Sequence, residues 1–243
     1  GFNAHISIFH STNLLGGREL GFSDFHDRVR QYPEVFQAFR SFVPLIGDLG
    51  ENAASFRLIE AGEKYTNRES FVQRIATFGS EYLELCSQTV RELRRVYSES
   101  ASYNQVCPAF EPVVALVKKL AEQVNFAICT TKPLENVEHF NKLFEISNCF
   151  VEIKVCPDAV TKAKIIRDLA EQRSIAYPDV FFVDDFARHL LPAKQQGMSC
   201  FYAEWGFGGR NDEAAALAAH IPVVSIKDFE KIMYELISDT RES

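Results

Sequence analysis

The second half of this sequence alternates between short apolar runs and segments of helical periodicity, and this alternation constrains the fold more than any other feature. The intervening segments and the end of the chain place apolar residues three and four positions apart, which predicts helices. Strands separated by helices pair in parallel through right-handed crossovers. The pattern therefore predicts an α/β fold with a doubly wound parallel sheet. The apolar runs predict strands at 125–129, 150–155, 180–183, 200–203 and 223–225.

A helical block interrupts this fold near its start. Residues 4–9 (AHISIF) predict a first, buried strand, and from about 23 to 98 the apolar residues recur at helical spacing. Thr66 and Glu69 have the spacing of a capping box before the longest of these helices. We therefore expect residues 1–18 and 106–243 to form an α/β core, with 19–105 as an inserted all-helical domain.

Composition excludes several classes of protein. The chain has 26 Lys and Arg against 33 Asp and Glu, a formal charge of −7, whereas nucleic-acid binders carry a basic surplus. No apolar run reaches the ~18–20 residues that span a bilayer. The 6 cysteines form no CxxC pair, which favours free thiols and a reducing compartment, the cytoplasm. We expect no partnership with nucleic acid or membrane.

Polar residues follow several of the predicted strands. In open parallel sheets, ligands bind beyond the carboxyl ends of the strands, so chemistry is expected at these positions. The segments are His10-Ser11-Thr12, Thr130-Thr131-Lys132, Asp184-Asp185-Phe186 and Glu204-Trp205-Gly206.

Taken together, these segments resemble the haloacid dehalogenase (HAD) superfamily, in the branch typified by phosphoglycolate phosphatases. FFVDDFARHLLPAKQQGMSCFYAEWGFG (181–208) is similar to that branch's strand–acid–helix–glycine–strand–WG segment. AICTTKPLENVEHFNKLFEI (127–146) is similar to its second motif, a strand ending in Thr before a helix. The helical insertion matches the branch's cap domain, so the resemblance covers essentially the whole chain. It implies a HAD-like core and a phosphatase-like hydrolase.

The first motif of the family is degenerate here. The resemblance implies an Asp nucleophile that forms an aspartyl-phosphate, and a second Asp two residues later as general acid and base. His10 and Thr12 stand at these two positions. A neutral imidazole makes no acyl phosphate and supplies no anionic ligand to Mg²⁺. His10 is interpreted as a hydrogen-bonded strand-end residue, with an unorthodox nucleophile or base as the alternative.

The phosphate-binding positions of the family are better preserved. Thr130 matches the hydroxyl that binds a phosphate oxygen, and Lys162 best matches the lysine that neutralises the phosphoryl group. Lys164 and Lys154 are rivals for the lysine position. The alternative for Lys162 is a solvated residue in the first turn of a helix.

The fourth motif retains one of the family's two acidic positions. Asp185, with Asp184 beside it, matches the family's acid after strand four, a possible Mg²⁺ ligand, and His189 stands where a later acid is expected. Both Asp residues would equally serve as N-caps of the following helix. His10, Asp185 and His189 also have the composition of a site for a transition metal, two histidines and one carboxylate.

Two functions are consistent with these residues. The favoured one is a catalytically impaired HAD-like protein, a pseudoenzyme, that binds a phosphorylated or anionic small ligand or a protein partner. The alternative is an active phosphatase of small phosphate esters that uses Mg²⁺ with the altered first motif. The resemblance implies that specificity lies in the cap, where Tyr65 and Arg68 are candidates for ligand contact or members of a solvated helix face.

Overall fold

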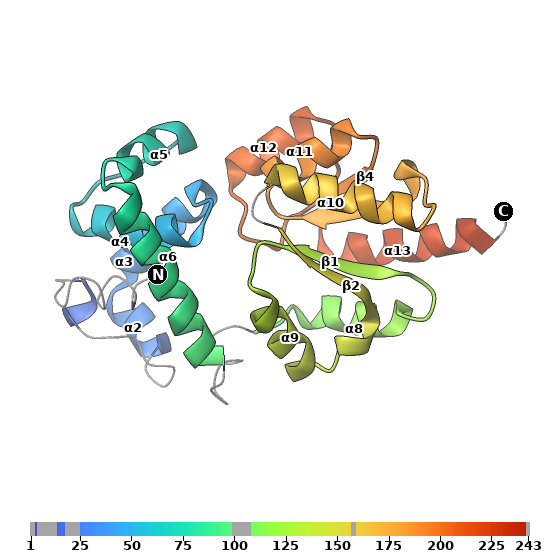
Figure 1. Ribbon diagram of the computed structural model, residues 1–243, viewed down its shortest axis with the longest axis horizontal. Helices are drawn as coiled ribbons and strands as arrows, with labels where there is room; N and C mark the ends of the chain where they lie inside the picture. Colours follow the sequence, from blue (N-terminus) through green and yellow to red (C-terminus); the bar gives the residue numbers. More distant parts are fainter. Residues whose placement is uncertain (1–2, 4–13, 18–24, 99–107, 157–158, 242–243) are drawn as a thin grey trace. The chain divides into compact units, whose positions relative to one another are not determined.

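The chain folds into two compact units, Gly1–Pro108 and Ala109–Ser243 (Figure 1). The computed structural model describes residues 3, 14–17, 25–98, 108–156 and 159–241. The strand predicted at 4–9, and His10 and Thr12 after it, lie outside the described residues.

The described part of the first unit is helical, which confirms the prediction of a helical block. The capping signal, expected before the longest helix, lies instead before the short helix α5, because the predicted long helix is divided into α5 and α6. The elements are η1 (Leu14–Gly17), α2 (Phe25–Gln31), α3 (Pro33–Phe42), η2 (Val43–Leu45), α4 (Leu49–Glu60), α5 (Arg68–Ala76) and α6 (Ser80–Ser98).

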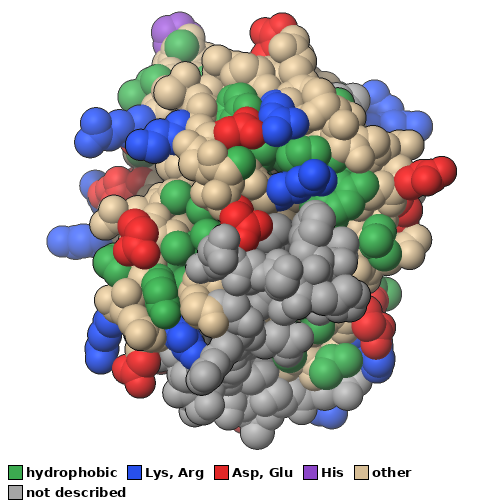
Figure 2. All heavy atoms as spheres, turned by 90° about the vertical axis from the view of Figure 1, so that its left-hand side faces the viewer, with side chains coloured by type: hydrophobic (Ala, Val, Ile, Leu, Met, Phe, Trp, Pro, Cys, Tyr) green, Lys and Arg blue, Asp and Glu red, His purple; other side chains and the backbone are tan. Residues whose placement is uncertain are grey.

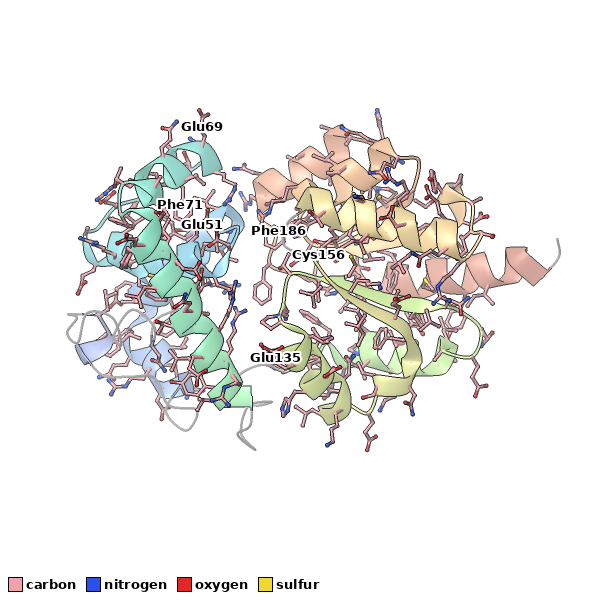
Figure 3. The ribbon with its side chains drawn as sticks, viewed as in Figure 1. Glu51, Glu69, Phe71, Glu135, Cys156 and Phe186 are labelled. Carbon is pink, nitrogen blue, oxygen red and sulfur yellow. The ribbon has the colours of Figure 1, made fainter. Side chains whose placement is uncertain are left out.

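Aromatic rings fill the core of this unit. Phe42 from α3 and Phe71 from α5 are 1% and 0% exposed, and their ring centroids lie 5.6 Å apart. Leu58 of α4 packs in the same cluster. Figure 3 shows Phe71 directed into the helices of the unit. The repeated aromatic residues of this block therefore serve as its packing.

Leu15 also packs in this unit. It is 1% exposed and contacts a cluster that contains Val35 and Phe56. The segment Leu14–Gly17 thus lies against the helices that follow it in sequence.

A buried acid, Glu51, holds the start of α5 to α4. The guanidinium of Arg68 donates to both carboxylate oxygens of Glu51, at 3.0 and 3.1 Å, and also to the carbonyl of Leu45. Glu51 lies within the helices of the unit (Figure 3) and is 6% exposed. A two-bond Arg–carboxylate pair fixes orientation as well as distance. Arg68, a candidate for ligand contact, is therefore engaged in holding the helices together.

The predicted capping signal is displaced by one residue. Asn67, and not Thr66, is the N-cap of α5, because its side chain accepts a hydrogen bond from the backbone N–H of Ser70 at 2.9 Å. Asn and Thr both serve at this position, so the spacing from Thr66 to Glu69 alone does not decide between them.

The described strands of the second unit are all parallel, as the alternation predicts. They form a two-stranded sheet, β1–β2, and a three-stranded sheet in the order β3–β4–β5. The strands are β1 (Phe126–Thr130), β2 (Phe150–Val155), β3 (Phe181–Asp184), β4 (Ser199–Ala203) and β5 (Val223–Val224). The helices between and around them are α8 (Glu111–Leu120), α9 (Leu134–Leu143), α10 (Ala159–Gln172), α11 (Ala187–Gln195), α12 (Arg210–Ala218) and α13 (Ile226–Arg241), with η3 (Ser147–Cys149) and η4 (Tyr177–Asp179).

Helices cover both faces of the three-stranded sheet. Phe182 packs with residues of α10 and α11, whereas its neighbour Val183 packs with residues of α8 and α13. Successive side chains of a strand point to opposite faces, so this alternation places one helical layer on each side. The layer of α10 and α11 is the one that carries polar side chains to the ends of the strands.

No helix in the described part of the chain is both long and apolar enough to cross a membrane. On the face that Figure 2 draws, acidic and basic side chains are interspersed with apolar ones.

Gly50 marks the close approach of α4 to α6 and provides a test of this packing. A Cβ at residue 50 would lie 2.6 Å from the backbone carbonyl oxygen of Leu83 and 3.0 Å from Oγ of Ser87. We expect Gly50→Ala to lower the free energy of unfolding by about 1–3 kcal/mol, although Ala is the better helix former by about 1 kcal/mol. The free energy of unfolding is measured by urea titration followed by far-ultraviolet circular dichroism. Asn52→Ala on the same helix is the control, and a stabilised Gly50→Ala protein would contradict the close approach.

Candidate functional site

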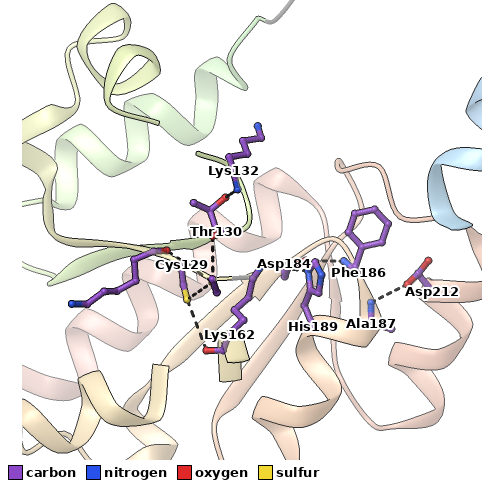
Figure 4. Close-up of polar contacts among 11 residues, drawn as sticks. Cys129, Thr130, Lys132, Lys162, Asp184, Phe186, Ala187, His189 and Asp212 are labelled. Carbon is purple, nitrogen blue, oxygen red and sulfur yellow. Dashed lines mark hydrogen bonds and ion pairs between the residues drawn. The ribbon is translucent and has the colours of Figure 1, made fainter. Parts of the chain in front are cut away.

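The candidate site lies where β1 and β3 end, and one lysine reaches both strands (Figure 4). β1 ends in Thr130 and β3 ends in Asp184. Lys162 of α10 brings its backbone carbonyl to 3.8 Å from Sγ of Cys129 in β1, and its ammonium to 2.8 Å from Oδ2 of Asp184. The structure therefore joins Lys162 directly to Asp184, and Thr130 is the neighbour in sequence of Cys129, which the backbone of Lys162 contacts.

Lys162, Asp184 and His189 form a compact buried cluster. Lys162 is 4% exposed, and the side chains of Asp184 and His189 are 11% and 13% exposed. Nδ1 of His189 lies 2.8 Å from Oδ1 of Asp184 and 3.3 Å from the Lys162 ammonium. The backbone N–H of Phe186 donates to the same Oδ1 at 3.0 Å. Both oxygens of Asp184 are therefore occupied within the protein.

The two contacts of His189 Nδ1 cannot both be ordinary hydrogen bonds, because a ring nitrogen either donates or accepts. Beside Lys162 the Asp184 carboxyl is ionised, because its pKa is lowered to about 2, so its oxygens can only accept. Nδ1 must then carry a proton and donate it to Asp184. The contact with Lys162 at 3.3 Å is consequently a close approach without a shared proton. This arrangement leaves two protons of the Lys162 ammonium for another acceptor.

The pKa of Asp184 shows which effect dominates in the cluster. Burial alone would raise this pKa, but the hydrogen bond from His189 and the positive charge of Lys162 outweigh it and lower the pKa from 3.8 to about 2. The carboxylate is therefore ionised at neutral pH and neutralises the buried lysine.

Asp185 is held by the loop after β4. Its Oδ2 accepts a hydrogen bond of 2.6 Å from the backbone N–H of Phe207. A Cβ on Gly206 would lie 2.1 Å from Cβ of Asp185, and one on Gly208 would lie 1.9 Å from the Asp185 carbonyl oxygen. Burial raises the pKa of Asp185, partly offset by the Phe207 hydrogen bond. The glycines of the WGFG segment thus permit the loop to close on this acid.

The N-terminus of α11 is capped from a distant residue. Asp212 of α12 accepts a hydrogen bond from the backbone N–H of Ala187 at 3.1 Å, while the N-cap residue Phe186 contributes no side-chain bond. From the sequence, a ligand role and a capping role are equally open for Asp184 and Asp185. Asp184 does accept from the Phe186 N–H, but the first residue of the helix is bound by Asp212. No local pattern identifies Asp212, because the pairing depends on how α12 packs on α11.

Thr130 presents a hydroxyl at the end of β1. Its Oγ1 accepts from the backbone N–H of Lys132 at 3.1 Å, so its own proton is available, and no described residue accepts it. Its backbone carbonyl accepts from the N–H of Cys156 at 2.8 Å. Figure 4 shows Lys132 beside Thr130 on the same turn.

The two rival lysines lie elsewhere. Lys154 belongs to β2 and pairs with Glu152 at 2.6 Å, and its side chain is 42% exposed. Lys164 is exposed on α10. Of the three candidates, Lys162 is therefore the lysine that contacts the acids at the end of β3.

Magnesium, the metal that the family implies, does not fit the described acids well. Mg²⁺ requires oxygen ligands in near-octahedral geometry. Both oxygens of Asp184 and one oxygen of Asp185 are already hydrogen-bonded, and Lys162 places a positive charge beside them. Among the described residues, no group of three or more His, Cys, Asp or Glu side chains is placed to hold a metal ion. His10, the third member of the alternative transition-metal set, lies outside the described residues.

The low pKa of Asp184 makes stability depend on pH. A carboxyl whose pKa is lowered on folding stabilises the native state above its ordinary value of 3.8, and this contribution is lost as pH falls toward 2. We expect Asp184→Asn, which leaves Lys162 without its counter-charge, to lower the free energy of unfolding at pH 7 by about 2–4 kcal/mol. The difference from the unsubstituted protein shrinks between about pH 4 and pH 2.

Fluorescence of Trp205, the single tryptophan, follows unfolding of this unit because the indole packs on Phe229. Asp168→Asn is the matched control, since Asp168 pairs with Arg167 at the surface, where its side chain is 42% exposed. An Asp184→Asn protein with unchanged stability at pH 7 would show that the buried pair does not stabilise the fold.

Comparison with known proteins identifies the family. The family model of haloacid dehalogenase-like hydrolases matches residues 60–203, more than half of the 243-residue chain. The match includes Thr130, Lys162, Asp184 and Asp185, and it begins after the positions of His10 and Thr12. No curated protein matches the chain.

Three solved structures share the fold. A haloacid dehalogenase-like family hydrolase from Streptococcus pneumoniae is 19% identical, with a TM-score of 0.51, over 77% of this chain and 93% of that one. A candidate phosphoglycolate phosphatase from Lactobacillus delbrueckii subsp. bulgaricus is 15% identical, with a TM-score of 0.55, over 79% and 82% of the two chains. Another from Haemophilus somnus is 14% identical, with a TM-score of 0.53, over 84% and 92%. These structures show the fold, and the match to the family model over more than half of the chain shows that this chain belongs to the haloacid dehalogenase-like hydrolase family.

Proposed function

We propose that this protein is a catalytically impaired member of its family that binds a small phosphorylated or anionic ligand at the ends of β1 and β3. The observation that carries the proposal is the replacement of both carboxylates of the first motif, by His10 and Thr12, in a chain that keeps Thr130 and Lys162. Phosphoryl transfer through an acyl phosphate needs the carboxylate nucleophile, and its removal costs many orders of magnitude in rate.

The donors at the strand ends support anion binding. The Thr130 hydroxyl has a proton to donate, and the Lys162 ammonium has two protons beyond the one given to Asp184. Because Asp184 already balances the charge of Lys162, the cluster attracts an anion through these hydrogen bonds more than through net charge. We expect the affinity for inorganic phosphate to be modest.

We propose the domain organisation that the sequence predicts, in which residues 1–18 and 106–243 form the core and residues 19–105 form the cap. We also propose that the cap selects the ligand.

We propose a reducing compartment, the cytoplasm, from the state of the cysteines. The described cysteines are free, which supports a reducing compartment such as the cytoplasm.

Catalytic impairment is tested with p-nitrophenyl phosphate and Mg²⁺. We expect hydrolysis by the unsubstituted protein to be no faster than hydrolysis by its Lys162→Met variant. The double change His10→Asp, Thr12→Asp restores the two carboxylates of the first motif. Mg²⁺-dependent hydrolysis by this variant would show that only the first motif has been lost, and no gain would show that the phosphate-binding residues have changed as well. Mg²⁺-dependent turnover by the unsubstituted protein that Lys162→Met abolishes would contradict the proposal and establish an active phosphatase with an altered first motif.

Ligand binding is tested with inorganic phosphate. We expect phosphate to raise the midpoint of thermal unfolding followed by Trp205 fluorescence, because a ligand that binds only the native state stabilises it. Thr130→Val removes the donating hydroxyl and should remove most of the shift. Thr131→Val, at the neighbouring exposed residue, is the matched control and should keep it. An equal shift in both variants would place phosphate elsewhere.

A further inference from the structure

Two cysteines lie in contact next to the candidate site. Sγ of Cys129 in β1 is 3.4 Å from Sγ of Cys156, the residue that follows β2. Cys129 pairs with Lys154 across the two parallel strands, so Cys156 lies two residues further along on the same face. The two side chains therefore point to the same side of the β1–β2 sheet.

The surroundings hold both thiols in place. Cys156 is 1% exposed, and its thiol lies 3.3 Å from the carbonyl oxygen of Thr130, to which it donates. Cys129 is half-buried, and its thiol lies 3.8 Å from the backbone carbonyl of Lys162. Cys156 follows β2 in one sheet and Phe186 follows β3 in the other, and Figure 3 labels both residues in the second unit.

From this contact we propose that Cys129 and Cys156 are a redox-active dithiol, which a peroxide converts to an intrachain disulfide. The proposal is independent of phosphate binding and of the proposed function. The sulfurs must approach from 3.4 Å to the bond length of about 2.05 Å. Because the N–H of Cys156 is held by the Thr130 carbonyl at 2.8 Å, rotation about the side-chain bonds of the two cysteines closes the distance.

The half-buried Cys129 is the sulfur that reacts first. Its thiolate attacks one oxygen of hydrogen peroxide, the O–O bond breaks, and the products are a sulfenic acid and, after proton transfer, water. The Cys156 thiolate then attacks the Cys129 sulfur, and the sulfenic hydroxyl leaves as a second water. Two thiols are oxidised by two electrons in total, and one peroxide is reduced to two waters. Burial raises the pKa of Cys129 to about 12, so the first step is slow at neutral pH and needs excess peroxide.

The experiment uses the full chain carrying Cys107→Ser, which removes the one cysteine outside the described residues. The reduced, folded protein is treated with hydrogen peroxide, alkylated, and digested without reductant for mass spectrometry. We expect a linked peptide that joins Cys129 to Cys156, the loss of two hydrogen masses from the intact chain, and full reversal by dithiothreitol. Cys129→Ser and Cys156→Ser should each abolish the linked peptide.

Cys200→Ser is the matched control, because Cys200 is buried in the same unit and its thiol faces the carbonyl of Leu190. This variant should still form the Cys129–Cys156 link. Two results would overturn the proposal. One is oxidation of Cys129 to the sulfinic acid while Cys156 remains open to alkylation after denaturation. The other is a lack of any link in a protein whose other thiols have been oxidised. If a serine variant fails to fold, the peptide map of the Cys107→Ser chain alone shows whether Cys129 and Cys156 become linked.

Discussion

The buried charge of Lys162 is the constraint on which the second unit depends. An ammonium that is 4% exposed requires a counter-charge, and Asp184 at the end of β3 supplies it. Because Lys162 also reaches Cys129 through its backbone carbonyl, a single turn of α10 touches strands of both sheets. His189 completes the cluster from α11 by donating to the same carboxylate. One ion pair thereby fixes a helix, two strand ends and the start of a second helix.

This constraint also shapes what the site can do. A lysine that Asp184 neutralises is less able to compensate a phosphoryl group, and an acid whose two oxygens are bound is a poor ligand for a hard cation. The hydrogen bonds that occupy this cluster, together with His10 and Thr12 at the positions of the first motif in the sequence, are the basis on which we propose a site that binds an anion and does not transfer a phosphoryl group.

The fold could be predicted from the sequence because the spacing of apolar residues indicates each strand and helix locally. The alternation after residue 110 predicts each strand of the second unit to within a residue or two, and β2 is predicted with its observed bounds. Thr130 and Asp184 could be singled out because the ends of parallel strands are identifiable from the chain alone. The sequence alone could not decide which of Lys162, Lys164 and Lys154 is the family's phosphate-binding lysine. The burial of Lys162 depends on which face of α10 meets β3, and that is a property of packing.

The features that the sequence did not predict depend on interactions between segments that lie far apart in the chain. The Asp212 bond to the first N–H of α11, the closing of Gly206 and Gly208 on Asp185, and the Arg68–Glu51 pair each join residues that no short pattern connects. The single shift from Thr66 to Asn67 has a different origin. Two adjacent residues are both able to cap, and the helix begins at Arg68, which makes Asn67 the N-cap.

A double-mutant cycle on Lys162 and Asp184 tests the central claim that this pair organises the unit. Free energies of unfolding at pH 7, from Trp205 fluorescence, are compared for the unsubstituted protein, Lys162→Met, Asp184→Asn and the double variant. The account predicts that each single change leaves a buried group without its partner, so the double variant is more stable than the sum of the single effects implies, by about 1–3 kcal/mol. Effects that add to within about 0.5 kcal/mol would contradict it, because independent sites behave in that way.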